Sequence, residues 1–161
     1  IKIIDAGNGN QMDTAFREGE GQYIHQQGPA PQQLAADGVG HVLAQLGPTI
    51  GACGFSSLAA TPAWLATDTA RAFTRAYIKT RDYMNDASAS EIAKAEKQLF
   101  PDIDLEVLTD CIATYQAMGC WTRHIDITQE GYDAMLDIFE YDGKLPHRYS
   151  YHQVCAPPPA I

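Results

Sequence analysis

Three consecutive polar residues, His25, Gln26 and Gln27, are the part of this chain best suited to bind a small molecule. They follow the strand-forming pair Tyr23–Ile24, and a Gly-Pro break leads into a helical pattern at Pro29. Polar side chains between the end of a strand and the start of a helix lie where open α/β sheets bind ligands. Imidazole and amide groups donate and accept hydrogen bonds, which suits a small polar or anionic organic compound. No nucleophile with its base accompanies them, so we expect recognition rather than catalysis.

A second polar group, Asn8, Asn10 and Gln11, lies at the first expected strand–helix junction. The free N–H groups of a helix N-terminus attract anions there, although ordinary capping explains the same residue types. His25 likewise has a simpler interpretation, as a strand-end histidine bonded to the backbone. Ser56 follows Phe55 and places a hydroxyl near an expected hinge. We take six residues as candidate ligand-binding residues and none as catalytic or metal-binding: His25, Gln26, Gln27, Asn10, Gln11 and Ser56.

The cysteines and the remaining histidines leave alternatives open. Cys53, Cys111, Cys120 and Cys155 form no CxxC pair, and four cysteines allow three full pairings. Buried free thiols at Cys53 and Cys111 are the simplest interpretation, and a Cys111–Cys120 disulfide in an oxidising compartment is the alternative. His147 and His152 with Cys155 match no zinc spacing. We therefore expect no metal and no cofactor.

Composition excludes some partners. The 161 residues are 45% hydrophobic and carry a net charge of −9, with the acidic residues scattered along the chain. A nucleic-acid partner requires clustered Lys and Arg, which are absent. No apolar run reaches the roughly 18 residues that span a bilayer. The chain starts without Met and within a predicted strand, so we expect a processed, trimmed or partial chain whose signal peptide would lie upstream.

The order of apolar residues and turn signals predicts two kinds of structure. Up to Thr61, short strands alternate with short helices, as in a parallel or mixed α/β sheet. From Pro62 onward the apolar residues repeat at helical spacing, and the tail from Cys155 is expected to be extended. The predicted strands are 1–4, 22–25, 39–46 and 55–60. The predicted helices are 11–18 with Asn10 as its cap, a short one from Pro29 or Pro31 that stops at Gly38, 68–84, one that Ser88 or Ser90 caps and that runs to Phe100, 105–118, and one to Phe139 that Thr128 caps.

Several segments in this order resemble a known protein family. The segment from Gly19 to Pro29 has the spacing of the pattern G-x-x-D-A-x-x-x-x-E-P, with Gln22 in place of Asp and Gly28 in place of Glu. The family comprises the substrate-binding proteins of ABC importers for alkanesulfonates, taurine, nitrate and the pyrimidine precursor of thiamine. The chain resembles their C-terminal half. The similar segments are 19–29, 38–43, 60–65, 72–77, 115–121, 128–132 and 149–151.

The resemblance implies an α/β fold, namely part of a type II periplasmic-binding-protein fold with one partial sheet lobe and a C-terminal helical portion. Residues 1–45 would be a second-lobe segment with a crossover strand, and residues 46–161 the C-terminal part of the first lobe. The implied function is non-enzymatic binding of a small nitrogen- or sulfur-containing solute outside the cytoplasm, for an ABC permease in the membrane. A chain that is a fragment would also self-associate through exposed apolar surface.

The residues leave two other functions open as alternatives. One is a free-standing sensory or structural module of the same fold. The other is an enzyme, because fungal thiamine-pyrimidine synthases are similar in the same segments. Those enzymes carry a cysteine-rich motif and a lysine that holds pyridoxal phosphate, and no such cysteine cluster is present here.

Overall fold

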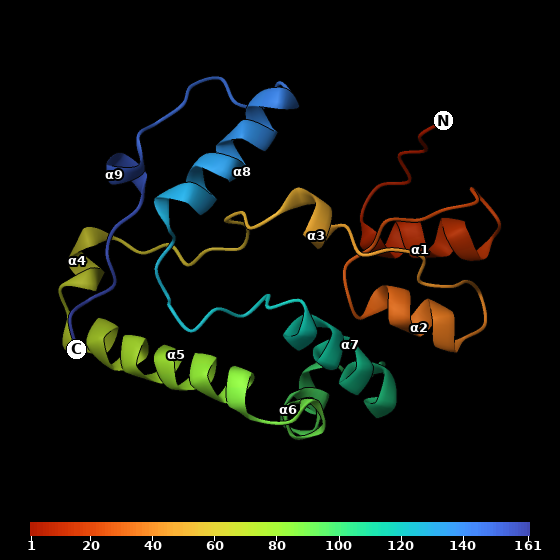
Figure 1. Cartoon of the computed structure of the whole chain (residues 1–161), viewed down its shortest axis with the longest axis horizontal. Helices are drawn as coiled ribbons and strands as arrows, with labels where there is room; N and C mark the ends of the chain where they lie inside the picture. The colour runs from red at the N-terminus through yellow and green to blue at the C-terminus, as the bar shows by residue number, and fades with distance from the viewer. The chain divides into compact units, whose positions relative to one another are not determined.

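The computed structural model describes residues 1–161, and every regular element in it is a helix (Figure 1). About half of the residues are helical, and no residue lies in a β-strand. The predicted α/β class is therefore wrong, and the chain is not a sheet lobe of a periplasmic-binding-protein fold. The elements are α1 (Gly9–Arg17), α2 (Ala30–Ala36), α3 (Gly47–Ile50), α4 (Pro62–Leu65), α5 (Asp68–Asp86), α6 (Ala89–Glu96), the 3₁₀ turn η1 (Lys97–Leu99), α7 (Leu105–Ala117), α8 (Gln129–Tyr141) and α9 (Tyr151–Val154).

All six predicted helices are confirmed, and several of them have a start signal besides their apolar spacing. Thr67 caps α5 and Thr128 caps α8, each accepting a backbone N–H from the first turn of its helix. Ser88 and Glu91 form a reciprocal capping box at the start of α6. The one-turn helices α3, α4 and α9 were not predicted, since four residues are too few to show a helical period.

None of the four predicted strands forms. The segments have strand-forming residues, but a β-strand is defined by backbone hydrogen bonds to a neighbouring strand. Residues 40–45 and 55–60 make no backbone hydrogen bond at all, so nothing in this chain pairs with them. Their apolar side chains, such as Leu43 and Phe55, are exposed as well. The sequence pattern indicated strand-forming residues but could not show that a pairing partner was lacking.

The chain divides into two compact units, which we describe separately. Unit 1 comprises Ile1–Ala44 and Ser88–Ala117, and unit 2 comprises Gln45–Ala87 and Met118–Ile161. Each unit therefore combines two segments that are separated in the sequence. The predicted assignment of residues 1–45 and 46–161 to lobes of a larger protein stays a prediction.

Unit 1 is held together by α7. This helix buries Val107, Leu108 and Ile112, and it packs against both α6 and α2. The facing residues are Ile92 of α6, which is 1% exposed, and Leu34 of α2. Burying side chains of this size stabilises a fold by roughly 1.5–3 kcal/mol each, so α7 and its two neighbours form the core that positions the rest of unit 1.

Individual contacts around α5 and α8 hold unit 2 together. Tyr132 of α8 is buried, and its hydroxyl donates to the Tyr149 carbonyl at 2.9 Å. The backbones at Gly54 and Gly131 lie directly against each other, joined by an N–H···O bond of 2.8 Å. A Cβ at Gly131 would lie 3.3 Å from the Gly54 nitrogen, so this approach favours glycine. No helix in either unit has the length and apolar character needed to cross a membrane.

Candidate functional site

Unit 1 brings together the two polar segments that the sequence singles out. The Gln26 side-chain amide donates a hydrogen bond of 2.6 Å to the carbonyl of Gly9, the first residue of α1. A Cβ at Gly9 would lie 3.4 Å from the Gln26 Oε1 atom, so the two groups are in direct contact. Residues 25–27 are thereby held beside the first turn of α1, although they are 17 positions away in sequence.

The N-terminus of α1 is built by Asn8 rather than Asn10. The Asn8 Oδ1 atom accepts the Gln11 N–H at 3.1 Å, and the Gln11 Oε1 atom accepts the Asn8 N–H at 2.9 Å. The prediction of Asn10 as the cap is wrong, because Asn8 is the residue with a glutamine three positions later that can reciprocate. Gln11 thus contributes its side-chain oxygen to the cap, while the amide of Asn10 is left exposed.

A shallow, open depression runs along the length of α1. It is lined by Asn10, Gln11, Thr14, Ala15 and Glu18. The Thr14 hydroxyl donates to the Asn10 carbonyl at 3.0 Å, so this hydroxyl serves the helix rather than the depression. A groove this open does not enclose a small molecule, since most ligand sites bury the greater part of their ligand.

The other predicted residues differ in their surroundings. The side chains of His25 and Gln27 are exposed and make no hydrogen bond within the protein. Ser56 belongs to unit 2, where it is also exposed and makes no hydrogen bond. Unit 1 therefore associates Gln26 with the α1 terminus that carries Asn10 and Gln11, and it leaves His25 and Gln27 free to contact a ligand.

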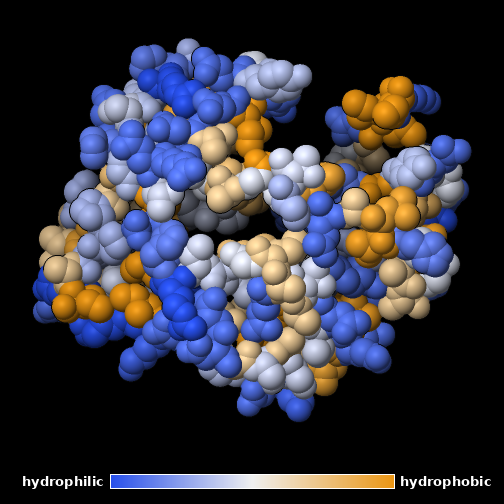
Figure 2. All heavy atoms as spheres, viewed as in Figure 1, coloured by the Kyte–Doolittle hydropathy of each residue, from blue (hydrophilic) through white to orange (hydrophobic).

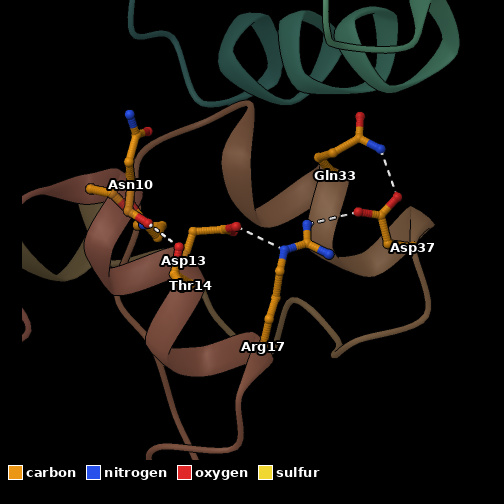
Figure 3. Close-up of polar contacts among 8 residues, drawn as sticks. Asn10, Asp13, Thr14, Arg17, Gln33 and Asp37 are labelled. Atoms are coloured by element: carbon orange, nitrogen blue, oxygen red, sulfur yellow. Dashed lines mark hydrogen bonds and ion pairs between the residues drawn. The ribbon is translucent and has the colours of Figure 1, made fainter.

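An ion-pair network fixes α1 against α2 beside this site (Figure 3). Arg17 of α1 contacts Asp13 of its own helix and Asp37 at the end of α2, each at 2.7 Å. Gln33 adds a bond of 2.8 Å to the second oxygen of Asp37. The hydrogen bond from Arg17, followed by that from Gln33, lowers the pKa of Asp37 below its usual value. The network is exposed, so its main effect is to orient the two helices rather than to add stability.

Two further glutamines were missed by sequence reasoning. The side-chain oxygens of Gln32 and Gln33, both on α2, are buried and accept no hydrogen bond. Buried acceptors without a donor are rare in folded proteins, and they indicate a place for water or a ligand. The repeated Gln-Gln pair after Pro31 was a visible signal, but helical position alone does not show which oxygens are left without a donor.

The segment 25–29 rests on α7. The Gly28 N–H donates to the Tyr115 hydroxyl oxygen at 3.1 Å, and a Cβ at Gly28 would lie 2.6 Å from the Cys111 Sγ atom. Burial, with a smaller effect of Glu96, raises the pKa of the Cys111 thiol to about 11. Cys111 is therefore a packing residue and not a reactive thiol. The resemblance to the family places Glu at position 28, but only glycine fits this contact.

The arrangement is suited to recognition by hydrogen bonding. All four cysteines are free, and no group of three or more His, Cys, Asp or Glu residues could hold a metal ion. His147 and His152 instead pack edge-on against Tyr149 and Tyr151, with ring centroids 4.6 and 5.3 Å apart. Unit 1 offers amide donors and acceptors around the α1 terminus, together with the free N–H groups of Gly9 and Asn10.

Comparison with known proteins gives one curated relative. The chain is 27% identical over 156 residues to the "Putative binding protein YtlA" of Bacillus subtilis (strain 168). The match covers 96% of this chain and 46% of the relative, so the chain spans just under half of the length of that protein. No family model matches the chain. No solved structure matches it significantly either. The chain is thus similar to a protein named for binding, which agrees with a binding role.

Proposed function

We propose that this chain is a solute-binding part of an ABC importer that takes a small nitrogen- or sulfur-containing organic compound. The similarity to a protein named as a binding protein supports the binding role. The segments that resemble binding proteins for sulfonates, nitrate and thiamine precursors support the importer and the solute class. Since the match spans under half of the relative, the chain would supply part of a complete binding site.

The observation that carries the proposal is the bond from Gln26 to the first turn of α1. This bond joins two polar segments and leaves His25, Gln27 and Asn10 with free side chains. Amide groups suit oxyanions and ring nitrogens equally, because they both donate and accept. The free N–H groups at the start of α1 add a preference for negative charge, which agrees with a sulfonate or nitrate group.

The remaining parts of the proposal follow from the same role. The chain would act without catalysis, would deliver its solute to an ABC permease and would work outside the cytoplasm. Support for these points is the family resemblance of the sequence, since the relative's name mentions binding alone. The function needs no cofactor, because hydrogen-bond donors and acceptors of the chain itself contact the solute.

The test compares solute binding by two glutamine variants. Calorimetric titrations would use taurine, methanesulfonate, nitrate and the pyrimidine precursor of thiamine. Gln26→Ala removes the bond to Gly9 and should weaken binding of the preferred solute by about tenfold, the value of a hydrogen bond of roughly 1–1.5 kcal/mol. Gln98→Ala is the matched control, because Gln98 is an exposed glutamine of unit 1 outside the site.

Equal affinities of the wild type and the Gln26→Ala variant would contradict the site. Binding of none of the four solutes at millimolar concentration would contradict the proposed solute class. Full affinity in the Gln98→Ala variant is required in either case, since a loss there would indicate a general effect on unit 1.

A further inference from the structure

Helix α5 of unit 2 carries a row of basic residues in a chain that is acidic as a whole. Arg71, Arg75 and Lys79 follow one another at intervals of four residues, so they lie in one row along the helix. Residues 69–81 contain no Asp or Glu, although the chain has a net charge of −9. Over α5, at the lower left of Figure 1, the surface is largely hydrophilic in Figure 2. The row is therefore a local positive surface.

Two cations of this row, Arg75 and Lys79, make no hydrogen bond and no ion pair, and both are exposed. Like charges four residues apart on a helix destabilise it, and the chain has 20 acidic residues that could relieve this repulsion. The other basic residues bind a carboxylate or a backbone carbonyl, except Lys2 and Lys94. Arg75 and Lys79 are thus two adjacent cations without a counter-ion.

The acidic residues of α5 do not supply that counter-ion, because each is bound by another arginine. Asp68 pairs with Arg71 at 2.5 Å. Asp82 and Asp86 pair with Arg123, which precedes α8 in the sequence. Hydrogen bonds from these arginines lower the pKa values of Asp68 and Asp86, so both carboxylates stay ionised and bound near neutral pH. A carboxylate for the free cations would come from outside this helix.

Small side chains lie beside the basic row. Ala72 and Ala76 are exposed, and the helical repeat of α5 places them between the row and Phe73. Phe73 is 46% exposed, and its ring stacks on that of Tyr77 at a centroid distance of 6.1 Å. A second helix can therefore come close to the α5 backbone here, with charged groups on the basic row and an apolar group against the Phe73 ring.

We propose that this face of α5 binds an acidic helical segment of another protein. Four residues of an α-helix rise about 6 Å, so carboxylates four residues apart on the partner match the spacing of Arg75 and Lys79. The row from Arg71 to Lys79 is about 12 Å long, which exceeds the size of a small anion. A membrane surface fits less well, because α5 turns its other side inward at Ala70 and Thr74 and has no apolar face left to enter lipid.

The test measures binding of synthetic peptides to the full 161-residue chain by fluorescence anisotropy at low ionic strength. One alanine-based helical peptide carries its glutamates four residues apart on one face, and a second peptide of equal composition distributes them around the helix. The double variant Arg75→Ala/Lys79→Ala should bind the first peptide at least about tenfold more weakly than the wild type does. Lys2→Ala/Lys94→Ala is the matched control, because it removes two other exposed cations without a partner and leaves the same net charge.

The wild type and the control variant should bind the first peptide equally well and prefer it to the second. An equal loss of affinity in the two double variants would overturn the inference, since it would indicate a general effect of charge. Equal binding of the two peptides would overturn it as well, because the row would not recognise the spacing of carboxylates. The same holds if no peptide binds at millimolar concentration, or if phosphatidylglycerol vesicles bind the chain more tightly than the first peptide does. Circular dichroism confirms that both double variants keep the helical content of the wild type.

Discussion

At the scale of single residues, Gly28 is a position with little room for change. Its missing side chain lets the Cys111 thiol and the Tyr115 ring approach the backbone directly. Through this contact the segment with His25, Gln26 and Gln27 is pressed onto α7, the central helix of unit 1. The proposed site therefore depends on a residue that makes no contact with a ligand.

A substitution of Gly28 by alanine should destabilise the protein. The added Cβ would lie 2.6 Å from the Cys111 sulfur and 2.9 Å from the Tyr115 oxygen, so α7 or the loop must shift. We expect a loss of about 1–3 kcal/mol in the free energy of unfolding, as for other overpacked cores. Urea denaturation measures this loss.

Gly47→Ala provides the matched control for that experiment. A Cβ at Gly47 meets no atom within 4 Å, and its backbone does not adopt a positive φ angle. This variant should unfold at the same urea concentration as the wild type or slightly above it, since alanine favours the helix α3. If Gly28→Ala were as stable as Gly47→Ala, the close packing of the loop on α7 would be disproved.

At the scale of elements, the α1 terminus shows how local signals decide structure. Asn8 and Gln11 satisfy each other's backbone N–H groups, and Asn10 takes no part. Asn8→Ala should cost about 1 kcal/mol in the free energy of unfolding, because the cap is lost. Asn10→Ala should leave the stability unchanged and weaken solute binding instead. Chemical denaturation of both variants gives the comparison.

If the Asn10→Ala variant were less stable than the Asn8→Ala variant, this description of the cap would be contradicted. A further result is informative for the site: a loss of binding in Asn10→Ala at unchanged stability separates ligand contact from helix formation. Asn8→Ala cannot serve for that purpose, since it alters the helix terminus itself.

The sequence allowed the helices to be predicted, but not the absence of the sheet. The helices α5, α6 and α8 carry an apolar face and have a capping residue directly before them, so both signals are local in the sequence. A strand depends on a partner elsewhere, and segments such as 40–45 find none in this chain. The contact of Gly28 with Tyr115, 87 positions away, was hidden for the same reason. Local patterns do not encode long-range partners.

The candidate site was predictable to a similar degree. The sequence shows that both segments are rich in polar residues. In the structure, the bond between Gln26 and Gly9 brings these two segments together. The role of Asn8, the unsatisfied oxygens of Gln32 and Gln33 and the network around Arg17 emerge from the tertiary structure. The buried oxygens of Gln32 and Gln33 and the pairing of Arg17 with Asp37 depend on how the helices pack, which no local window contains.

At the scale of the whole molecule, two units share one chain, and each is built from two separated segments. The relative named as a binding protein is about twice as long as the match. The open depression at α1 and the exposed apolar segments agree with a module whose surfaces are covered in a larger assembly. Solute affinity in the isolated chain is accordingly expected to be weak, since an open site leaves much of a ligand in water.

The central claim, a solute site where residues 25–27 meet the start of α1, is tested most directly by NMR. Taurine, methanesulfonate, nitrate and the pyrimidine precursor of thiamine would be titrated into the ¹⁵N-labelled chain while the amide signals are followed. We predict saturable shifts at residues 8–11 and 25–27 for at least one of these solutes. Saturable shifts confined to unit 2, or no shift at millimolar solute, would contradict the claim.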